Sequence, residues 1–385
     1  MAYSVFGRGY TNQWNLRPGA MTQIVCFRGH SGLAAVEKAW RLILEGMPER
    51  FLHHEVEWYA SCLDTAIEPS ELFLLLVLRD SHPVAICPLL RVREWVLGIP
   101  MTILTQPDHY VSEDFVYARS AGNETIFADV LRFLRAPGGI RHDMLRLDRV
   151  RADSAVMFSL SSAPVTDAVI RPDGFSAAIA RNIVYTDGIS RVPRKFRANL
   201  RAASRRLSSL GGVTFQHVRT CPEIEHAFAT FLQIEASGWK RGNGAIATDV
   251  DYTRFYKTLS ERFGVAGKCE ISMLMNNDRC LAAQLIFITG NTLTVLKTAY
   301  DQNFRRFSPG HVLLSQTIER SSAPMQGGWI DLVSDPAWCR AWLPHRTPQF
   351  VVSAFRDALR PRLVKNLMSL QQVLSNTSIL SRKGF

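Results

Sequence analysis

Residues 298–311 read Thr298-Ala299-Tyr300-Asp301-Gln302-Asn303-Phe304-Arg305-Arg306-Phe307-Ser308-Pro309-Gly310-His311. The apolar residues that begin this stretch end a predicted strand, Ser308 is a favourable helix N-cap, and Pro309 suits the first turn of a helix. A helix N-terminus attracts phosphate through its free amide groups, and Arg305 and Arg306 add positive charge there. Gly310 lets a ligand approach the backbone closely. The pattern predicts a site for a pyrophosphate-bearing cofactor, with a well-capped surface turn as the alternative.

The residues on either side of this stretch predict an α/β domain. Apolar runs and alternating patterns predict strands, and apolar spacing of three to four residues predicts helices. The expected helices are residues 195–210, 223–236, 251–263 and 310–320, and the expected strands are residues 213–218, 270–275, 281–289, 292–299 and 329–333. Short turns at residues 276–278 and 290–291 indicate that three of these strands form an antiparallel meander.

The first half of the chain shows a similar order of elements. It predicts helices at residues 34–47, 54–64 and 123–134, and strands at residues 72–78, 84–92 and 144–147. Both halves read as helices, an antiparallel meander, one further helix and a strand, an order that indicates duplication. The expected fold is α/β (α+β), with two tandem domains, 1–165 and 166–385, each a mixed, mostly antiparallel sheet flanked by helices.

Composition sets limits on the class of protein. A chain of 385 residues with 47% apolar content predicts a globular protein with two cores. No apolar run approaches the roughly 20 residues of a membrane span, and residues 1–6 lack the layout of a signal peptide, so we expect a soluble, cytoplasmic protein. The seven cysteines are scattered, so neither a disulfide framework nor a metal site is expected.

The positive charge is concentrated in one segment. The net charge is +11, and residues 191–206 hold seven basic residues and no acidic one. In the predicted helix, Phe196, Leu200, Ala203 and Leu207 form an apolar stripe, and the arginines lie on other faces. The basic face predicts a contact with tRNA or with an acidic acyl carrier protein, and a merely solvated surface is the alternative. The arginines proposed for that contact are Arg194, Arg197, Arg201 and Arg205.

Several ordered blocks together resemble a known family. They are residues 192–201, Arg205-Arg206-Leu207, Glu235 with Trp239-Lys240, residues 297–301, and Ser308-Pro309-Gly310 with Leu313-Leu314. These blocks, within residues 190–345, resemble the GNAT-type acyltransferase family of the cellulose-biosynthesis protein CelD, which is akin to the FemAB-like transferases. The first half is similar to the degenerate N-terminal GNAT unit that these proteins often carry.

The resemblance implies that an acyl group passes to an amine from acyl-CoA or a related thioester, without a metal. In the general GNAT pattern, an Arg or Gln, two residues, a Gly, one residue and a Gly or Ala form the pyrophosphate loop. This chain fits at Arg305 and Gly310, whereas Ser308 replaces the first Gly. The cofactor-binding residues carried over are Arg305, Arg306, Phe307, Ser308, Gly310 and His311.

The transfer requires that the amine lose a proton and attack the thioester carbonyl directly. The catalytic candidates are Glu235 and Asp331 as bases and Tyr300 at the strand end, each with a structural role as the alternative. The candidates for substrate binding are Trp239, Lys240, Lys297, Asp301 and Trp338. Trp338 stands where the family tends to have a tyrosine that could protonate the leaving thiolate, so the general acid is unassigned, with His311 and His345 as conceivable replacements.

Three functions remain open at this stage. The first is an N-acyltransferase that uses an acyl thioester, either acyl-CoA or carrier-bound, and a small amine acceptor. The second keeps the fold and changes the donor, because FemAB-like enzymes take an aminoacyl group from tRNA. The third is a non-catalytic binding subunit, since Ser308 and Trp338 occupy positions where site residues are expected.

Overall fold

The most apolar stretch of the chain, residues 72–78, forms the buried strand β3 (Leu72–Arg79). A strand that is apolar on both faces is stable only where both faces are covered. Phe73, Leu75 and Val77 belong to a core cluster with residues of helix α3 (Ile126–Arg135). Helix α1 (Gly29–Glu45) also packs on β3.

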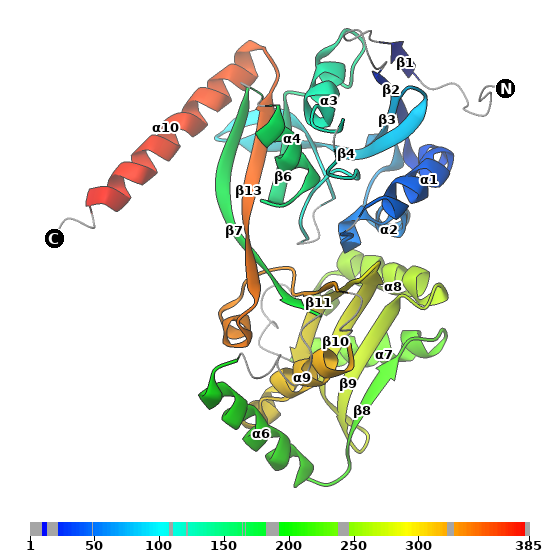
Figure 1. Cartoon of the computed structure of the whole chain (residues 1–385), viewed down its shortest axis with the longest axis vertical. Helices are drawn as coiled ribbons and strands as arrows, with labels where there is room; N and C mark the ends of the chain where they lie inside the picture. The colour runs from blue at the N-terminus through cyan, green and yellow to red at the C-terminus, as the bar shows by residue number, and fades with distance from the viewer. Residues whose placement is uncertain are drawn as a thin grey trace. The chain divides into compact units, whose positions relative to one another are not determined.

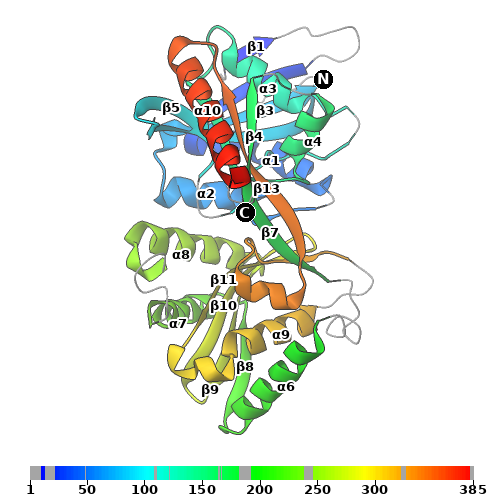
Figure 2. The same cartoon turned by 90° about the vertical axis from the view of Figure 1, so that its left-hand side faces the viewer.

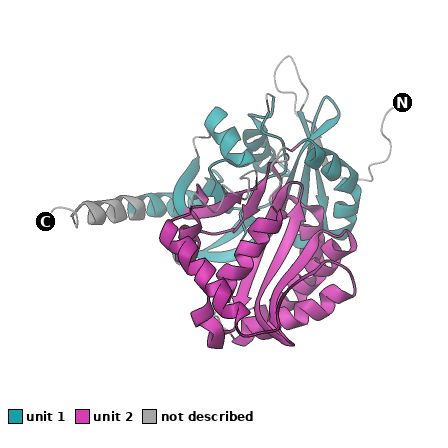
Figure 3. Ribbon diagram, turned by 60° about the horizontal axis from the view of Figure 1, so that its bottom comes forward, with its two compact units in different colours: residues 1–46, 68–173, 349–385 teal, residues 47–67, 174–348 magenta. Residues whose placement is uncertain are grey.

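The computed structural model describes residues 10–13, 22–47, 49–107, 111–120, 122–163, 165, 167–181, 192–237, 246–321 and 327–381. The chain divides into two compact units (Figure 3). Unit 1 comprises residues 1–46, 68–173 and 349–385, and unit 2 comprises residues 47–67 and 174–348. Each unit is therefore built from segments that are separate in the sequence.

The sheet of unit 1 has the strand order β1-β2-β3-β4-β5-β6-β13. Its further strands are β1 (Tyr10–Gln13), β2 (Thr22–Arg28), β4 (His82–Val96), β5 (Ile99–Thr105), β6 (Met144–Arg151) and β13 (His345–Phe355). All neighbouring strands in this sheet are antiparallel except β5 and β6, which are parallel. Helices α4 (Ala155–Ser162) and α10 (Leu359–Ser381) complete the unit, together with a short helix, Pro69–Glu71.

The sheet of unit 2 has the order β7-β12-β11-β10-β9-β8. Its strands are β7 (Ala168–Ala180), β8 (Val213–Val218), β9 (Cys269–Asn276), β10 (Arg279–Thr289), β11 (Thr292–Tyr300) and β12 (Trp329–Asp331). Its helices are α2 (Val56–Thr65), α6 (Arg194–Ser208), α7 (Glu223–Ser237), α8 (Val250–Val265) and α9 (Pro309–Ser321). Its short helices are Leu52–His54, Ile246–Thr248, η5 (Gln302–Phe307) and η6 (Ala337–Trp342). Helices α7 and α8 cover one face of the β9–β11 strands, and α6 and α9 lie on the other (Figures 1 and 2).

The two units repeat one arrangement of elements. In unit 1, β3, β4 and β5 form an antiparallel meander, α3 follows, and β6 pairs in parallel with β5. In unit 2, β9, β10 and β11 form the meander, α9 follows, and β12 pairs in parallel with β11. This confirms the predicted fold class, a mixed and mostly antiparallel sheet flanked by helices in each half.

The sheet of unit 1 is completed by β13, a strand from the second half of the sequence. β7 follows β6 along the chain, yet its residues 178–180 pair with β12 in unit 2. β13 follows β12 along the chain, yet its residues 349–355 pair with β6 in unit 1. The tandem domains 1–165 and 166–385 remain a proposal. The compact units differ from them because residues 47–67 belong to unit 2, and residues 166–173 and 349–385 belong to unit 1.

Several elements were not predicted from the sequence. Strands β1, β2, β5 and β13 were not expected, and no element was expected between residues 147 and 195. The structure places α4 and β7 within that stretch. β7 contains Pro172 and Gly174, which weaken the pattern of a strand, and its stability comes from pairing with a distant partner.

Helix α2 provides a test of the exchanged packing, because it comes from the first half of the sequence and packs on α8 in unit 2. Trp58 is 1% exposed and meets Phe255 edge to face, with 5.1 Å between ring centroids. We predict that Trp58→Ala lowers the free energy of unfolding by about 3–5 kcal/mol, because it opens a cavity in that contact. Urea denaturation followed by circular dichroism measures the change.

The matched control is Trp95→Ala, since Trp95 is 75% exposed. This substitution is expected to change the free energy of unfolding by less than about 0.5 kcal/mol. Equal effects of the two substitutions would contradict the packing of α2 on α8.

Candidate functional site

Strands β11 and β12 pair over only three residues. The parallel register joins Thr292 to Trp329, Leu293 to Ile330 and Thr294 to Asp331, where β12 ends. Strand β11 continues to Tyr300. β10 pairs with one edge of β11, and β12 pairs with the other edge only as far as Thr294. Among the described residues, no strand pairs with residues 295–300 along that second edge. Backbone N–H and C=O groups need hydrogen-bond partners, so this edge can bind an extended ligand.

A β-bulge lies at the start of the open edge. The register with β10 joins Lys297 to Leu285 and Val295 to Ile286, so Leu296 is an extra residue in β11. A bulge bends its strand and changes the faces to which the following side chains point. Val295 packs in the core cluster that includes residues of α9, whereas the Nζ atom of Lys297 lies 5.8 Å from the centre of the Tyr256 ring on α8.

The loop after β11 is held by Asp301. This carboxylate is 8% exposed and accepts hydrogen bonds from the Asn303 amide at 2.9 Å and from Arg279 Nη2 at 2.6 Å. The first contact caps η5, and the second ties η5 to the start of β10. Asp301 therefore sets the path by which the chain leaves β11 and enters α9.

Helix α9 begins at Pro309, as predicted. Ser308 has a left-handed backbone (φ 51°, ψ 48°), and its carbonyl accepts hydrogen bonds from the amides of His311 and Val312, each at 3.1 Å. Arg305 and Arg306 are exposed at the end of η5. The first turn of a helix carries partial positive charge, so this end of α9 can bind an anion, with two arginines beside it.

The far end of α9 is fixed by a buried ion network. Arg320 pairs with Glu270 of β9, which is fully buried, and Glu270 also accepts hydrogen bonds from Arg219 Nε at 2.6 Å and from the Ser272 hydroxyl at 2.5 Å. Burial raises the pKa of the Glu270 carboxyl, but these donors together outweigh burial and lower the pKa below its usual value. The network therefore holds α9 on the sheet through a charged carboxylate.

Aromatic rings surround His311 in the first turn of α9. Trp342 Nε1 donates a hydrogen bond to His311 Nδ1 at 3.1 Å, and the rings of Phe196 and Trp338 meet the imidazole edge to face, with centroids 5.4 and 6.0 Å away. An indole N–H only donates, so Nδ1 accepts and the imidazole hydrogen is on Nε2. Burial lowers the pKa of His311. His311 is therefore held as a neutral hydrogen-bond donor.

The segment that carries the two tryptophans is anchored by Asp335. This carboxylate accepts a hydrogen bond from Arg346 Nε at 2.9 Å and pairs with Arg340. Burial raises the pKa of Asp335, but the hydrogen bond from Arg346 and the charge of Arg340 outweigh burial and hold the pKa below its usual value. The charged carboxylate fixes η6, and η6 places Trp338 and Trp342 against His311.

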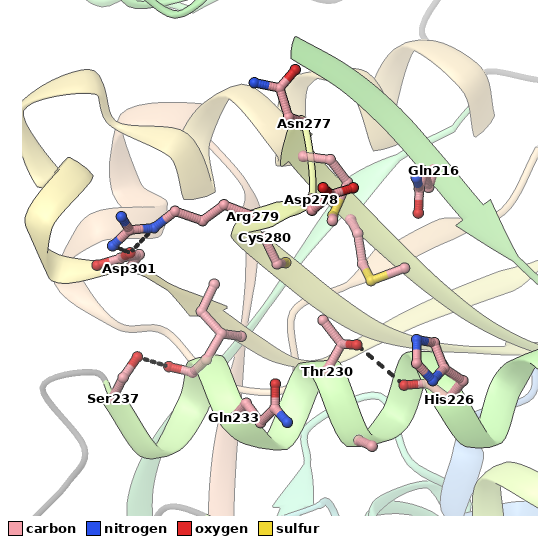
Figure 4. A pocket seen from close by; sticks show the side chains of 14 residues that line it. Gln216, His226, Thr230, Gln233, Ser237, Asn277, Asp278, Arg279, Cys280 and Asp301 are labelled. Atoms are coloured by element: carbon pink, nitrogen blue, oxygen red, sulfur yellow. Dashed lines mark hydrogen bonds and ion pairs between the residues drawn. The ribbon is translucent and has the colours of Figure 1, made fainter. Parts of the chain in front are cut away.

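A groove of about 680 Å³ lies between α7 and the strands of unit 2, on the face of the sheet opposite to α9 (Figure 4). We name it the α7 groove. It is lined by Gln216, His226, Ala229, Thr230, Gln233, Ile234, Ser237, Met273, Met275, Asn277, Asp278, Arg279, Cys280 and Asp301. Sequence reasoning found only Asp301 among these residues, because the others come from segments whose proximity is set by the fold.

A segment of unit 2 matches a known protein family. Residues 194–334 match the acetyltransferase (GNAT) domain family. The match covers β8–β12 and α6–α9. It therefore includes the open edge of β11, the α7 groove and residues 302–308, which carry Arg305 and Arg306 and which we name the arginine loop. No curated protein matches the sequence. The narrower resemblance to the CelD family stays a prediction.

Solved structures share the fold over most of the chain. FemX is 12% identical, with a TM-score of 0.56, and the similarity covers 85% of this chain and 96% of the FemX chain. L-PGS from Bacillus licheniformis is 10% identical, with a TM-score of 0.51, covering 85% of this chain and 94% of that one. A protein of unknown function from Bacteroides thetaiotaomicron is 10% identical, with a TM-score of 0.51, covering 84% and 97%. At these identities the similarity shows the fold alone.

Both acids predicted as bases lie within the matched segment, and each accepts a hydrogen bond from a backbone amide. Glu235 is 1% exposed, and its Oε2 atom accepts a hydrogen bond from the Ile246 amide at 2.7 Å. Asp331 is 7% exposed, and its Oδ1 atom accepts one from the Val333 amide at 2.9 Å. These contacts give each acid a structural role, and catalysis by either stays a prediction. Trp239 and Lys240 lie outside the described residues.

Tyr300 lies beside the first turn of α9, and helix α6 contacts the arginine loop. A Cβ atom built on Gly310 would lie 3.7 Å from Tyr300 Cδ1, so Tyr300 lies against the first turn of α9. Arg206 Nη2, at the end of α6, donates to the Arg306 carbonyl at 3.3 Å. Of the apolar stripe predicted for α6, Leu200, Ala203 and Leu207 are buried and Phe196 is half-buried against the same core. Its outer face exposes Arg194, Arg201 and Arg205, whereas Arg197 is half-buried.

Two further observations concern membranes and metals. Of the helices in the described ranges, none combines the length and apolar character needed to cross a bilayer. Within the same ranges, no group of three or more His, Cys, Asp or Glu side chains is arranged to hold a metal ion.

The Trp342–His311 contact generates a prediction about pH. The folded pKa of His311 is lowered, so its contribution to stability is present above the unfolded pKa of ~6.5 and is lost as the pH falls through the folded pKa. We predict that Trp342→Phe raises the folded pKa of His311, because a hydrogen on Nδ1 would no longer face an indole N–H. An NMR titration of the imidazole ¹⁵N signals measures this pKa.

Trp338→Phe is the matched control, since Trp338 contacts the His311 ring without a hydrogen bond. It is expected to leave the Nε2–H form in place and to change the pKa less than Trp342→Phe does. A wild-type spectrum with the hydrogen on Nδ1 would contradict the assignment.

Proposed function

We propose that the GNAT domain is an N-acyltransferase, which moves an acyl group from an acyl thioester to an amine acceptor by direct attack. The observation that supports this most strongly is the open edge of β11 over residues 295–300, next to the N-terminus of α9 and its arginines. An extended donor that ends in phosphates needs backbone partners along its length and positive charge at its end. The two features supply both within one continuous segment.

The donor proposed is acyl-CoA or a carrier-bound acyl thioester. GNAT domains typically use acyl-CoA, and residues 194–334 match that family. The residues proposed to hold the phosphates are Arg305, Arg306, Phe307, Ser308, Gly310 and His311. The first amides of α9 and the guanidinium groups of Arg305 and Arg306 provide the charge, and Gly310 leaves room for the phosphate at the helix backbone.

The chemistry proposed needs no covalent enzyme intermediate. The amine loses a proton and attacks the thioester carbonyl, an N–H of the β11 edge stabilises the oxyanion, and the thiolate leaves. Glu235 and Asp331 are the proposed bases, and Tyr300, at the end of β11, is the third proposed catalytic residue. Lys297, Asp301 and Trp338 are proposed to contact substrate, together with Trp239 and Lys240.

A second candidate function is aminoacyl transfer from tRNA. It is favoured by the basic face of α6, where Arg194, Arg201 and Arg205 are exposed, and by the contact of Arg206 with the arginine loop. The same face suits an acidic acyl carrier protein, which would deliver the first donor. A non-catalytic binding subunit is the remaining alternative, and it requires that no donor binds.

Gly310→Asp tests the proposed donor site. We predict that this substitution weakens acetyl-CoA binding by about a hundredfold or more, because a carboxylate at the helix start repels phosphate. The domain is expected to stay folded, since the contacts that a Cβ would make with Tyr300 and Thr298, at 3.7 and 3.8 Å, are ordinary. Isothermal titration calorimetry measures the affinity, and circular dichroism checks the fold.

Gly46→Asp makes the same chemical change at the end of α1, where the backbone φ is −80° and a side chain is tolerated. This control is expected to bind acetyl-CoA as the wild type does. Unchanged affinity in Gly310→Asp would exclude this loop as the donor site, and no binding by the wild type would favour the tRNA-dependent or non-catalytic alternative.

Charge reversal on α6 tests the macromolecular donor. We predict that Arg201→Glu with Arg205→Glu weakens binding of tRNA or of an acyl carrier protein by at least tenfold at low salt, and less at high salt, because the attraction is screened. Filter binding measures tRNA affinity, and fluorescence anisotropy measures carrier-protein affinity. Arg197 is left unchanged because it is half-buried.

The control carries Lys38→Glu with Arg93→Glu, two exposed residues of unit 1. It has the same net charge as the α6 variant, so it separates a local contact from a general effect of charge. If both variants bind tRNA and carrier protein equally well, the basic face of α6 is only a solvated surface.

A further inference from the structure

The hairpin of β4 and β5 in unit 1 exposes large apolar side chains around its turn. Trp95 is 75% exposed and Leu97 is 40% exposed, whereas Leu89 and Ile103, farther from the turn in the same hairpin, are fully buried. Trp95 pairs across the hairpin with Pro100, which is also exposed. We name residues 95–100 the hairpin tip. Its two large apolar side chains add little to the core of unit 1.

The backbone conformation of Leu97 is unfavourable for a leucine. Leu97 and Gly98 form the two-residue turn between the strands, and their φ angles are 51° and 78°. Turns with two positive φ angles favour asparagine or aspartate before glycine, because this backbone is costly for a bulky side chain. Burial of an exposed leucine within the protein offsets little of that cost. A contact outside the chain would account for a leucine here.

The start of helix α10 adds to the same apolar surface. Arg360 Nη1 donates a hydrogen bond to the Pro100 carbonyl at 3.3 Å, so the first turn of α10 lies beside the hairpin tip (Figure 2). Leu359 in that turn is 88% exposed. Val364 and Met368 are buried against residues of β5 and hold the helix on unit 1. The start of α10 therefore presents a third large apolar side chain near the tip.

Positive charge surrounds this apolar surface. Six basic residues and two acidic ones lie in the two segments that form it, residues 91–102 and 356–365. The acids, Glu94 and Asp357, each pair with an arginine. Arg93 is exposed and lies on the same face of β4 as the tryptophan of the tip, because side chains two residues apart in a strand share a face. The surface is complementary to an anionic partner that also offers an apolar layer.

We propose that the hairpin tip and the start of α10 bind the surface of an anionic lipid membrane. Trp95, Leu97 and Leu359 would enter the interfacial layer, and the basic side chains would lie at the lipid phosphates. Tryptophan favours this layer because its ring is apolar and its N–H is polar. Apolar insertion and attraction to anionic lipids reinforce each other. A nucleic acid would match the charge but leave the leucines in water, so a membrane fits both properties better.

The test is sedimentation of the protein with unilamellar vesicles of two compositions, phosphatidylcholine alone and equal parts of phosphatidylcholine and phosphatidylserine. We expect binding to the mixed vesicles, and binding at least about tenfold weaker to phosphatidylcholine alone, because the neutral vesicles lack the electrostatic attraction. Arg93→Gln is expected to weaken binding to the mixed vesicles about fivefold, since it removes one positive charge at the membrane surface.

Leu97→Asn separates membrane contact from a role in folding. Asparagine suits a positive φ before glycine, so the Tm is expected to stay the same or to rise. Binding to the mixed vesicles is expected to weaken at least about fivefold, because the apolar contact is lost. Leu42→Asn is the matched control, the same change at a leucine of α1 in unit 1 that is 56% exposed, and it is expected to bind as the wild type does.

Trp95 reports on insertion directly. Brominated lipids in the mixed vesicles are expected to quench part of the tryptophan fluorescence of the wild type, and Trp95→Phe is expected to lose most of that quenching. The proposal is wrong if the wild type does not sediment with the mixed vesicles, if Leu97→Asn and Leu42→Asn bind equally, or if Trp95→Phe is quenched like the wild type. Adsorption through the basic face of α6 would give the last two results. A dimer that Leu97→Asn dissociates, measured by light scattering, together with no vesicle binding would assign the tip to a second copy instead.

Discussion

The early end of the pairing between β11 and β12 is the constraint on which the rest of unit 2 depends. β12 stops at Asp331, where the Asp331 carboxylate holds the amide of Val333. Val333 has a positive φ of 65°, which is costly for a β-branched residue, and the hydrogen bond offsets part of that cost. The chain therefore turns away from β11, and the bulge at Leu296 bends β11 at the same level. The open edge is the result of both.

Helix α9 is fixed beside the open edge of β11, so the positive charge of its first turn has a defined position along that edge. Glu270 and Arg320 hold the C-terminal end of α9 on the sheet, and Asp301 sets the loop that leads to its N-terminal end. Because both ends are fixed, the positive first turn stays beside residues 295–300. The arginines of η5 and α6 add positive charge on this face.

Local patterns in the sequence predicted the helices and meander strands of unit 2, and the start of α9 at Pro309, because apolar periodicity and capping residues act within a few positions. They could not predict that residues 349–355 pair with β6, because that pairing joins segments far apart in the sequence. The candidate site, too, was predicted only in part. The arginine loop was readable from consecutive residues, but the bulge at Leu296, the Trp342–His311 hydrogen bond and the α7 groove exist only after distant segments have packed.

The replacement of the expected tyrosine by Trp338 leaves the proposed transfer without an obvious proton donor, and the state of His311 bears on this point. A neutral imidazole with its hydrogen on Nε2 is a weak acid, but it is a hydrogen-bond donor that keeps its hydrogen when the pH changes above its pKa. A thiol has an unperturbed pKa of about 8.5, so its thiolate is a moderately stable leaving group near neutral pH. Hydrogen bonding can stabilise such a thiolate without prior protonation. The proposed acyl transfer therefore does not require a tyrosine at position 338.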